Sequence, residues 1–164
     1  MNAGAMGEEI GKFVHSVTMV NRVGEINQRE VKHNEFKYRQ WVGGKDGVVA
    51  IGHFCLKQDR SKNIQQICQN TVNQRKAKQP QAPSAGSIFK NPPGDYAGRL
   101  IEAVGLKGVV VGGAMISLRH ANFIVNNGGA TSADVMELME LMKKKVKRET
   151  GVRLEPEVKM FGDQ

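Results

Sequence analysis

The sequence contains no apolar run long enough to span a bilayer, and its N-terminus lacks the basic-then-apolar layout of a signal peptide. Neither membrane insertion nor export is therefore expected, and the expected compartment is the cytoplasm. The two cysteines, Cys55 and Cys68, form no CxxC pair, and no group of histidines and cysteines has the spacing of zinc ligands. We expect both thiols to be reduced and no metal to be bound.

The chain also lacks the glycine-rich patterns GxGxxG and GxxxxGK[ST], which excludes an ordinary Rossmann or P-loop site. Aromatic residues make up only 5% of the chain, so few side chains could stack on bases, and no RRM, KH, helix-turn-helix or zinc signature is legible. The net charge of +8 nevertheless indicates attraction to anions. Nucleic acid, a membrane surface and phosphorylated small molecules stay open as partners, as does a basic surface that only contacts solvent.

The length of 164 residues and the 40% content of hydrophobic residues suit one sizeable domain or two small ones. The hydrophobic periodicity predicts an α+β protein. Strands are expected over residues 13–20, 26–31, 48–56, 108–117, 123–126 and 152–161, and helices over residues 61–76, 96–104 and 131–150. The polar, proline-rich segment 79–83 predicts a boundary between one domain at residues 1–80 and another at residues 81–164.

The first and the last predicted helix each carry apolar residues at helical spacing, and we expect both stripes to face a core. They comprise Ile64, Ile67, Cys68, Thr71 and Val72 in the first helix, and Val135, Leu138, Met139, Met142 and Val146 in the last.

Residues 84–94 form the most unusual segment. Ser87 follows small residues and precedes two apolar residues, Lys90, Asn91 and the turn Pro92-Pro93-Gly94. Because the ring of Pro92 disfavours helix at Asn91, residues 87–89 are predicted to form a short strand that runs into a turn. The spacing of Ser87 and Lys90 matches the S-x-x-K pattern of serine acyl-transfer enzymes. That chemistry needs both side chains on one helical turn, whereas a strand points them oppositely, so we reject it.

Three polar residues stand out in apolar or turn-flanked strands: Arg39, Ser87 and Glu157. Taken singly, such residues are more often surface or structural. Together they would supply a cation, a hydroxyl donor and a carboxyl group. That set is suited to stabilising and protonating a carbanion or an enolate.

The stretch PSAGSIFKNP at residues 83–92 resembles the serine motif of the UDP-N-acetylenolpyruvoylglucosamine reductase family. Further stretches resemble the same family in the same order along the chain. They are residues 1–5, 38–39, 97–102, 105–108, 112–114, 120–126 and 154–158. The resemblance covers nearly the whole chain.

The resemblance implies an FAD enzyme in which NADPH provides the electrons that reduce UDP-N-acetylglucosamine enolpyruvate to UDP-N-acetylmuramate, a peptidoglycan precursor. It implies Ser87 as the proton donor, with Glu157 and Arg39 stabilising the intermediate. The remaining implied site residues bind the substrate near its diphosphate or bind the cofactor. They are Asn91, Lys90 and Arg75 for the substrate, and Asn2, Ala3 and Gly4 for FAD.

The glycine-rich pyrophosphate loop that precedes these motifs in the family has no counterpart here. The chain is therefore expected to be a C-terminal portion, and we expect it to bind FAD weakly or not at all by itself. Two alternatives stay open: a redox-inactive substrate-binding module and a basic nucleic-acid-binding domain.

Overall fold

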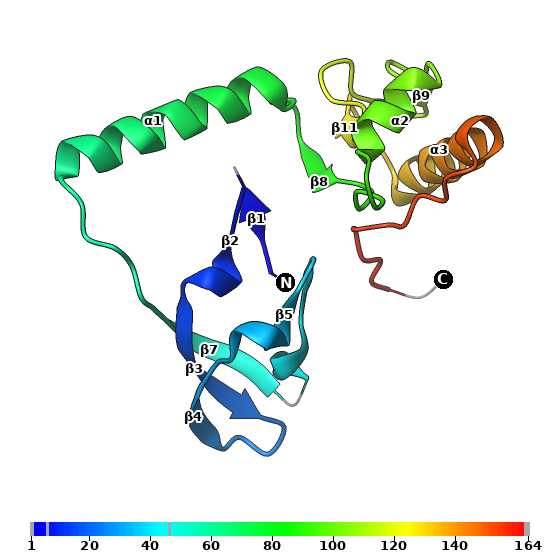
Figure 1. Cartoon of the computed structure of the whole chain (residues 1–164). Coiled ribbons are helices and arrows are strands. Elements are labelled where there is room, and N and C mark those ends of the chain that lie inside the picture. Colours follow the sequence, from blue (N-terminus) through cyan, green and yellow to red (C-terminus); the bar gives the residue numbers. More distant parts are fainter. Residues whose placement is uncertain (1, 6, 46, 163–164) are drawn as a thin grey trace. The chain divides into compact units, whose positions relative to one another are not determined.

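A computed structural model describes residues 2–5, 7–45 and 47–162 of the chain. Two compact units can be distinguished, Met1–Thr71 and Val72–Gln164, and helix α1 (Ser61–Lys78) begins in the first and ends in the second (Figure 1). Both units contain antiparallel sheets, and the helices are separate segments of the chain rather than crossovers between parallel strands. This arrangement confirms the predicted α+β class. The domain boundary between residues 80 and 81 stays a prediction.

The first unit is built on an antiparallel sheet of three strands in the order β4-β3-β7. The strands predicted over residues 13–20 and 26–31 pair as a hairpin, and the side-chain oxygen of Asn21 accepts the N–H groups of Val23 and Glu25 in its turn, at 3.0 and 2.9 Å. The strands of this unit are β1 (Gly4–Ala5), β2 (Glu8–Glu9), β3 (Val14–Asn21), β4 (Ile26–Glu30), β5 (Phe36–Lys37), β6 (Gln40–Trp41) and β7 (Gly47–Phe54). Short 3-10 helices cover Ile10–Lys12, His33–Glu35 and Val42–Gly44.

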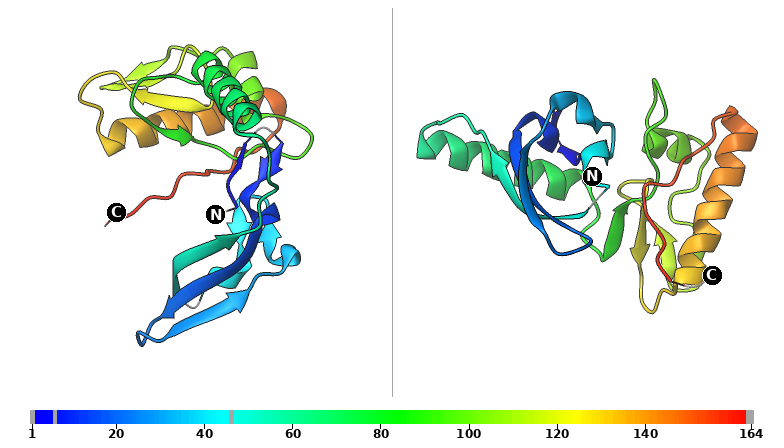
Figure 2. Two further views of the ribbon diagram at one scale, coloured as in Figure 1. Left: turned by 90° about the vertical axis from the view of Figure 1, so that its left-hand side faces the viewer. Right: turned by 90° about the horizontal axis from the view of Figure 1, so that it is seen from below.

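The second unit is an antiparallel four-stranded sheet in the order β8-β11-β10-β9, packed with helices α2 and α3 around one core (Figure 2). Its elements are β8 (Ser84–Ser87), α2 (Ala97–Ala103), β9 (Val110–Val111), β10 (Ala114–Ile116), β11 (Phe123–Asn126) and α3 (Ser132–Thr150). The most deeply buried side chains of that core include Ile88, Phe89, Ile101, Ile116, Leu138 and Met142.

Helix α3 forms as the sequence predicts. Thr131 Oγ1 accepts the N–H of Asp134 at 3.2 Å, and Asp134 Oδ2 accepts the N–H of Thr131 at 2.9 Å, which together cap the first turn. Gly151 ends the helix in the left-handed conformation. The predicted stripe is buried at Leu138, Met139, Met142 and Val146 and partly buried at Val135.

The stripe predicted for the first helix does not face a core. Ile64, Ile67 and Val72 are 47%, 61% and 43% exposed, and α1 buries none of its residues within the described part of the chain. Helical periodicity determines which residues share a face, but it does not determine whether the chain contains a surface to cover that face. No helix of the described residues has the length and apolar character needed to cross a membrane.

Three strand predictions are wrong in detail. Residues 108–117 form a hairpin of β9 and β10 rather than one strand, because the chain reverses at Gly112-Gly113. Residues 152–161 form no strand and make only an isolated bridge at Pro156, whose missing N–H cannot continue a ladder. The strand predicted over residues 87–89 is displaced, since β8 ends at Ser87, and Ile88 and Phe89 are both buried.

Candidate active site

Ser87 is the last residue of β8 and lies where this strand changes register against β11. Ser84 is opposite Val125 and Ser87 is opposite Phe123, so β8 carries one extra residue, which forms a β-bulge. Gly86 enters the bulge with φ of 82°, in the left-handed region that other residues rarely adopt. The bulge bends the strand immediately before Ser87 and therefore determines the direction of the main chain at this half-buried serine.

Beyond Ser87 the main chain is held from both sides. The carbonyl oxygen of Asn122 accepts the N–H of Ile88 at 2.9 Å. On the other side, the carbonyl oxygen of Ile88 accepts the N–H of Glu157 at 2.8 Å. Glu157, which is distant in the chain, is thereby brought beside the residue that follows Ser87.

The C-terminal segment continues this pairing along the next two residues, Phe89 and Lys90. Lys90 donates its N–H to the carbonyl oxygen of Glu155 at 2.8 Å, and Phe89 is bridged to Pro156. The side chains of Lys90 and Glu155 also form an ion pair. The extended segment after α3, drawn in red in Figure 2, is thus fastened to the Ser87 segment by main-chain hydrogen bonds.

A pocket of about 400 Å³ opens beside Ser87 within the second unit. Its walls come from the Ser87 segment, from α2 and from the residues before β11. The polar side chains that line it include Ser87, Asn91, Tyr96, Arg99, Arg119 and His120. Such a concave site with a few convergent polar groups is where a small molecule is expected to bind.

Arg99 and Arg119 bring positive charge to the pocket, and Glu102, which pairs with Lys107, brings negative charge. Arg99 forms an ion pair with Asp95, and the hydrogen bond from Arg99 lowers the pKa of this carboxyl to about 2. Asp95 is therefore ionised at neutral pH, and its negative charge balances the positive charge of Arg99. Arg119 donates instead to the carbonyl oxygen of Lys76 at 2.6 Å, a neutral partner that leaves the full cationic charge of Arg119 in place. An anionic ligand is therefore favoured over a cationic one.

Two of the substrate residues that the resemblance implies, Lys90 and Arg75, are not among the residues that line this pocket. Lys90 is adjacent in sequence to the pocket residue Asn91, and its side chain pairs with Glu155. Arg75 is exposed in the last turn of α1. The third, Asn91, does line it, and its Oδ1 accepts the N–H of Ala97 at the start of α2 at 3.1 Å. The substrate-binding roles of all three stay predictions.

His120 also lines the pocket, although nothing in the sequence marks it as a candidate catalytic or binding residue. Its Nδ1 accepts the N–H of Asn122 at 3.2 Å, and its ring packs edge-on against Phe123, with 5.0 Å between the ring centroids. A Cβ at Gly98 would lie 2.8 Å from the ring, so only glycine leaves room for it. Burial lowers the pKa of His120, which favours the neutral imidazole. The only sequence signal was its place in the stretch 120–126.

Arg39 belongs to the first unit, where it occupies a strained position. It is the second residue of the two-residue turn between β5 and β6, and its φ is +56°. A residue with a side chain costs about 1–2 kcal/mol in this conformation. Strain of this kind persists only where the surrounding structure enforces it, and it is commonest at functional sites.

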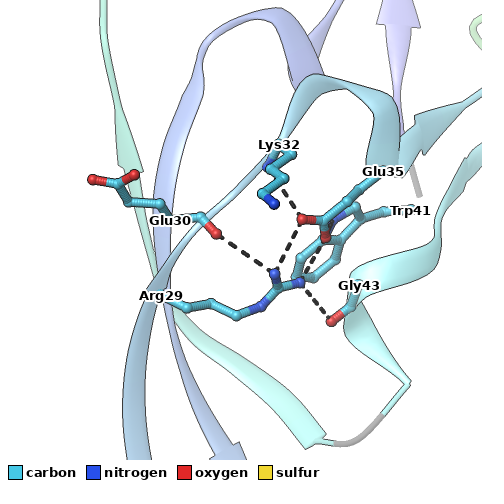
Figure 3. Close-up of polar contacts among 6 residues, drawn as sticks. All are labelled: Arg29, Glu30, Lys32, Glu35, Trp41 and Gly43. Atoms are coloured by element: carbon cyan, nitrogen blue, oxygen red, sulfur yellow. Dashed lines mark hydrogen bonds and ion pairs between the residues drawn. The ribbon is translucent and has the colours of Figure 1, made fainter.

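A compact group of polar contacts flanks this turn (Figure 3). Arg29 donates to both carboxylate oxygens of Glu35, at 3.1 and 2.7 Å, and to the carbonyl oxygen of Gly43 at 3.0 Å. Trp41 Nε1 donates to the same carboxylate, and the guanidinium of Arg29 lies 5.5 Å from the ring centre of Trp41. The hydrogen bonds from Arg29 lower the pKa of Glu35 to about 2, so this anchor stays ionised at neutral pH.

The predicted cofactor residues Asn2, Ala3 and Gly4 lie at the β1–β2 hairpin. Asn2 is buried, and its side chain holds the hairpin by accepting the N–H of Gly11 at 2.9 Å and donating to Glu9 at 2.6 Å. Ala3 and Gly4 are exposed. A Cβ at Gly4 would lie 3.0 Å from the carbonyl oxygen of Glu8, so glycine at this position accommodates the pairing of β1 with β2. The cofactor-binding roles of all three residues stay predictions.

The second unit is thus an α+β domain with a polar, cation-lined pocket, the kind of site that binds anionic small molecules. Residues 78–161 match the family model described as UDP-N-acetylenolpyruvoylglucosamine reductase, C-terminal domain. The chain belongs to this family, and the resemblance read from its motifs is confirmed.

Individual relatives agree with this assignment. The chain is 44% identical to UDP-N-acetylenolpyruvoylglucosamine reductase 2 of Symbiobacterium thermophilum, with 99% of this chain and 53% of the relative covered. For the reductase of Listeria monocytogenes the identity is 42%, with 99% and 55% covered. The crystal structure of the reductase from Thermus caldophilus matches with a TM-score of 0.82 and 38% identity, covering 97% of this chain and 57% of that one. The chain spans about half the length of the curated relatives it matches.

Proposed function

We propose that this chain is the substrate-binding part of an FAD-dependent reductase that converts UDP-N-acetylglucosamine enolpyruvate to UDP-N-acetylmuramate with NADPH as electron donor. The observation that carries the proposal is the hydrogen bond from the N–H of Glu157 to the carbonyl oxygen of Ile88, the residue after Ser87. It links a carboxyl-bearing and a hydroxyl-bearing residue at one segment, and Ser87 lines a cation-lined pocket.

We assign residues 81–164 to substrate binding and residues 1–80 to part of the FAD-binding domain. The start of the family match at residue 78 supports this division. Asn2 would hold the hairpin against which the flavin lies, and the exposed backbone of Ala3 and Gly4 would contact it. When bound, FAD would supply hydride, taken from NADPH, to the β carbon of the enolpyruvyl group.

The residues of this chain would then handle the charge and the proton. Arg39 neutralises the negative charge that develops on the carboxylate, and Glu157 donates a hydrogen bond to it. The hydroxyl of Ser87 delivers a proton to the α carbon. A hydroxyl is a weak acid, but a carbanionic carbon is basic enough to accept its proton.

Recognition of the substrate's diphosphate would fall to cationic and amide side chains. Asn91 lines the pocket, and Lys90 and Arg75 lie in the same unit. Arg119, whose guanidinium donates to a carbonyl oxygen, adds a further cation, while Glu102 of the same pocket pairs with Lys107. The net charge of +8 is then explained by two diphosphate ligands, the substrate and the flavin.

The test joins residues 1–164 to the part of the Symbiobacterium thermophilum reductase that this chain does not match; we call the product the joined protein. It should bind one FAD per chain and oxidise NADPH rapidly only when UDP-N-acetylglucosamine enolpyruvate is added. Mass spectrometry should identify UDP-N-acetylmuramate as the product. The unaltered Symbiobacterium reductase is the control for assay conditions.

Several outcomes would refute the proposal. A joined protein that binds FAD and reacts with NADPH, but never with the enolpyruvate, would exclude this substrate. Strongly salt-dependent binding of the 164-residue chain to DNA or RNA would favour the nucleic-acid alternative. Stoichiometric flavin on the 164-residue chain alone would leave the proposal standing, but it would contradict the separate expectation that this chain by itself binds FAD weakly or not at all.

A further inference from the structure

A buried carboxamide lies beside the Ser87 segment, in the wall of the same pocket. Asn122, the residue before β11, is 3% exposed. Its Oδ1 accepts the N–H of Phe89 at 3.0 Å, and its Nδ2 donates to the carbonyl oxygen of Phe89 at 2.8 Å. One side chain therefore satisfies both main-chain groups of one residue, as the opposite residue of an antiparallel strand normally does.

The carboxamide continues the pairing beyond the end of the sheet. The last paired residues are Ser87, where β8 ends, and Phe123, where β11 begins; one residue further on, the carbonyl oxygen of Asn122 accepts the N–H of Ile88. The other edge of the same segment is bound to the N–H of Glu157 through the carbonyl oxygen of Ile88. Ile88 and Phe89 are thus clamped between Asn122 and the segment that carries Glu157.

We propose that Asn122 is a positioning residue: its carboxamide fixes the main chain of Ile88 and Phe89 and thereby the spacing of the Ser87 hydroxyl and the Glu157 carboxyl. The inference rests on the proposed function. Asn122 is in the pocket wall, but both ends of its carboxamide are bound to Phe89, so it acts through the main chain of Ile88 and Phe89. Because a displacement of 1 Å at reacting groups can cost about 10²-fold in rate, a residue that fixes the main chain beside the reacting groups can control turnover.

The clamp requires a donor and an acceptor in one planar group. Alanine offers neither. In Asn122→Asp, the neutral carboxyl offers one of each, whereas the ionised carboxylate offers only acceptors and faces the carbonyl oxygen of Phe89. Burial raises the pKa of the introduced carboxyl, so its ionisation should fall within an accessible pH range.

Other ionisable groups lie near residue 122, and their titration could also change kcat with pH. Their contribution must be separated from that of the introduced carboxyl. Arg99 and Glu102 of α2 line the same pocket, as do Arg119 and His120 before Asn122, and Glu157 lies on the C-terminal segment. Of these, a histidine is the group that ordinarily titrates between pH 5.5 and 8. Dividing each variant's kcat by that of the unchanged joined protein at the same pH removes contributions common to both.

We expect the kcat of Asn122→Asp to be about 10²-fold below that of the unchanged joined protein at pH 8. The deficit should shrink at least about tenfold by pH 5.5, as the neutral carboxyl restores both hydrogen bonds. Asn122→Ala should be slow throughout, with NADPH still reducing the flavin. Asn126→Asp is the matched control: it lies exposed on β11, it keeps the Oδ1 that accepts the N–H groups of Gly128 and Ala130, and its kcat ratio should not vary with pH.

Circular dichroism at each pH gives the folded fraction, to which kcat is referred. If Asn122→Ala does not fold, the comparison of Asn122→Asp at the two pH values decides. The positioning role is overturned if both Asn122 variants, per folded protein, turn over within about twofold of the unchanged joined protein across the range. Absence of turnover in the unchanged joined protein would instead refute the proposed function.

Nuclear magnetic resonance of the 164-residue chain tests the clamp without turnover. In Asn122→Asp, the amide resonances of Ser87 and Glu157 should shift together as the introduced carboxyl titrates. In Asn126→Asp they should stay fixed. A titration seen at the amide of Phe89 but at neither Ser87 nor Glu157 would overturn the proposal.

Discussion

Replacing Ser87 with alanine in the joined protein should leave the reduction of FAD by NADPH intact and lower kcat by about 10²–10⁴-fold, the usual worth of a positioned proton donor. The β-bulge at Gly86 and the main-chain hydrogen bonds of Ile88 do not involve the hydroxyl, so the variant should keep its fold. Stopped-flow absorbance measures the two half-reactions separately.

Ser84→Ala is the matched control for this variant. Ser84 is the first residue of the same strand β8, it is exposed, and it is not among the residues that line the pocket. Its kcat should stay within about twofold of the unchanged value, as for an ordinary surface substitution. If Ser87→Ala turns over as fast as Ser84→Ala, Ser87 is not the proton donor.

The second large effect is expected at Glu157. In Glu157→Gln the side chain keeps its size and can still donate a hydrogen bond, but its amide is a much weaker acid than a carboxylic acid and therefore stabilises the developing negative charge less. We expect kcat to fall about 10²-fold or more while the KM for the enolpyruvate changes little, because the lost interaction strengthens only in the transition state. Steady-state kinetics in the joined protein measure both constants.

Glu155→Gln provides the comparison, since Glu155 lies two residues earlier on the same segment. Its side chain is 71% exposed and pairs with Lys90. Surface ion pairs contribute about 0–1 kcal/mol, so a change of no more than a few-fold is expected. Equal losses of kcat in the two variants would mean that the segment is sensitive to any removal of charge, and Glu157 would then have no specific role.

The double variant Ser87→Ala/Glu157→Gln should lose less kcat than the product of the two single losses, because both residues act on one intermediate.

Much of the second unit could be predicted from the sequence because local signals and tertiary packing agree there. Helix α3 carries a capping box, a C-terminal glycine and an apolar stripe, and the stripe faces the core as predicted. The segment around Ser87 is recognisable because Pro92 restricts the main chain at Asn91 and because a hydroxyl, a cation and a carboxamide lie close together in the sequence.

The remaining features depend on partners that are distant in sequence. The stripe of α1 is regular, yet nothing in the periodicity of Ile64 and Ile67 states whether a covering surface exists. Asn122 could not be distinguished from an ordinary pre-strand asparagine, because its role consists of two hydrogen bonds to a residue far away in the chain. Arg39 was singled out for its charge, but its left-handed conformation follows from the β5–β6 turn.

The most direct test of the account is a crystal structure of the joined protein with FAD and UDP-N-acetylglucosamine enolpyruvate bound in the Ser87→Ala variant, which holds the substrate unreacted. We expect the Arg39 guanidinium and the Glu157 carboxyl to lie within about 3.2 Å of the enolpyruvyl carboxylate, or one water away, with the Cβ of residue 87 facing the α carbon. An enolpyruvyl group bound away from Arg39, or out of reach of residue 87, would contradict the proposal.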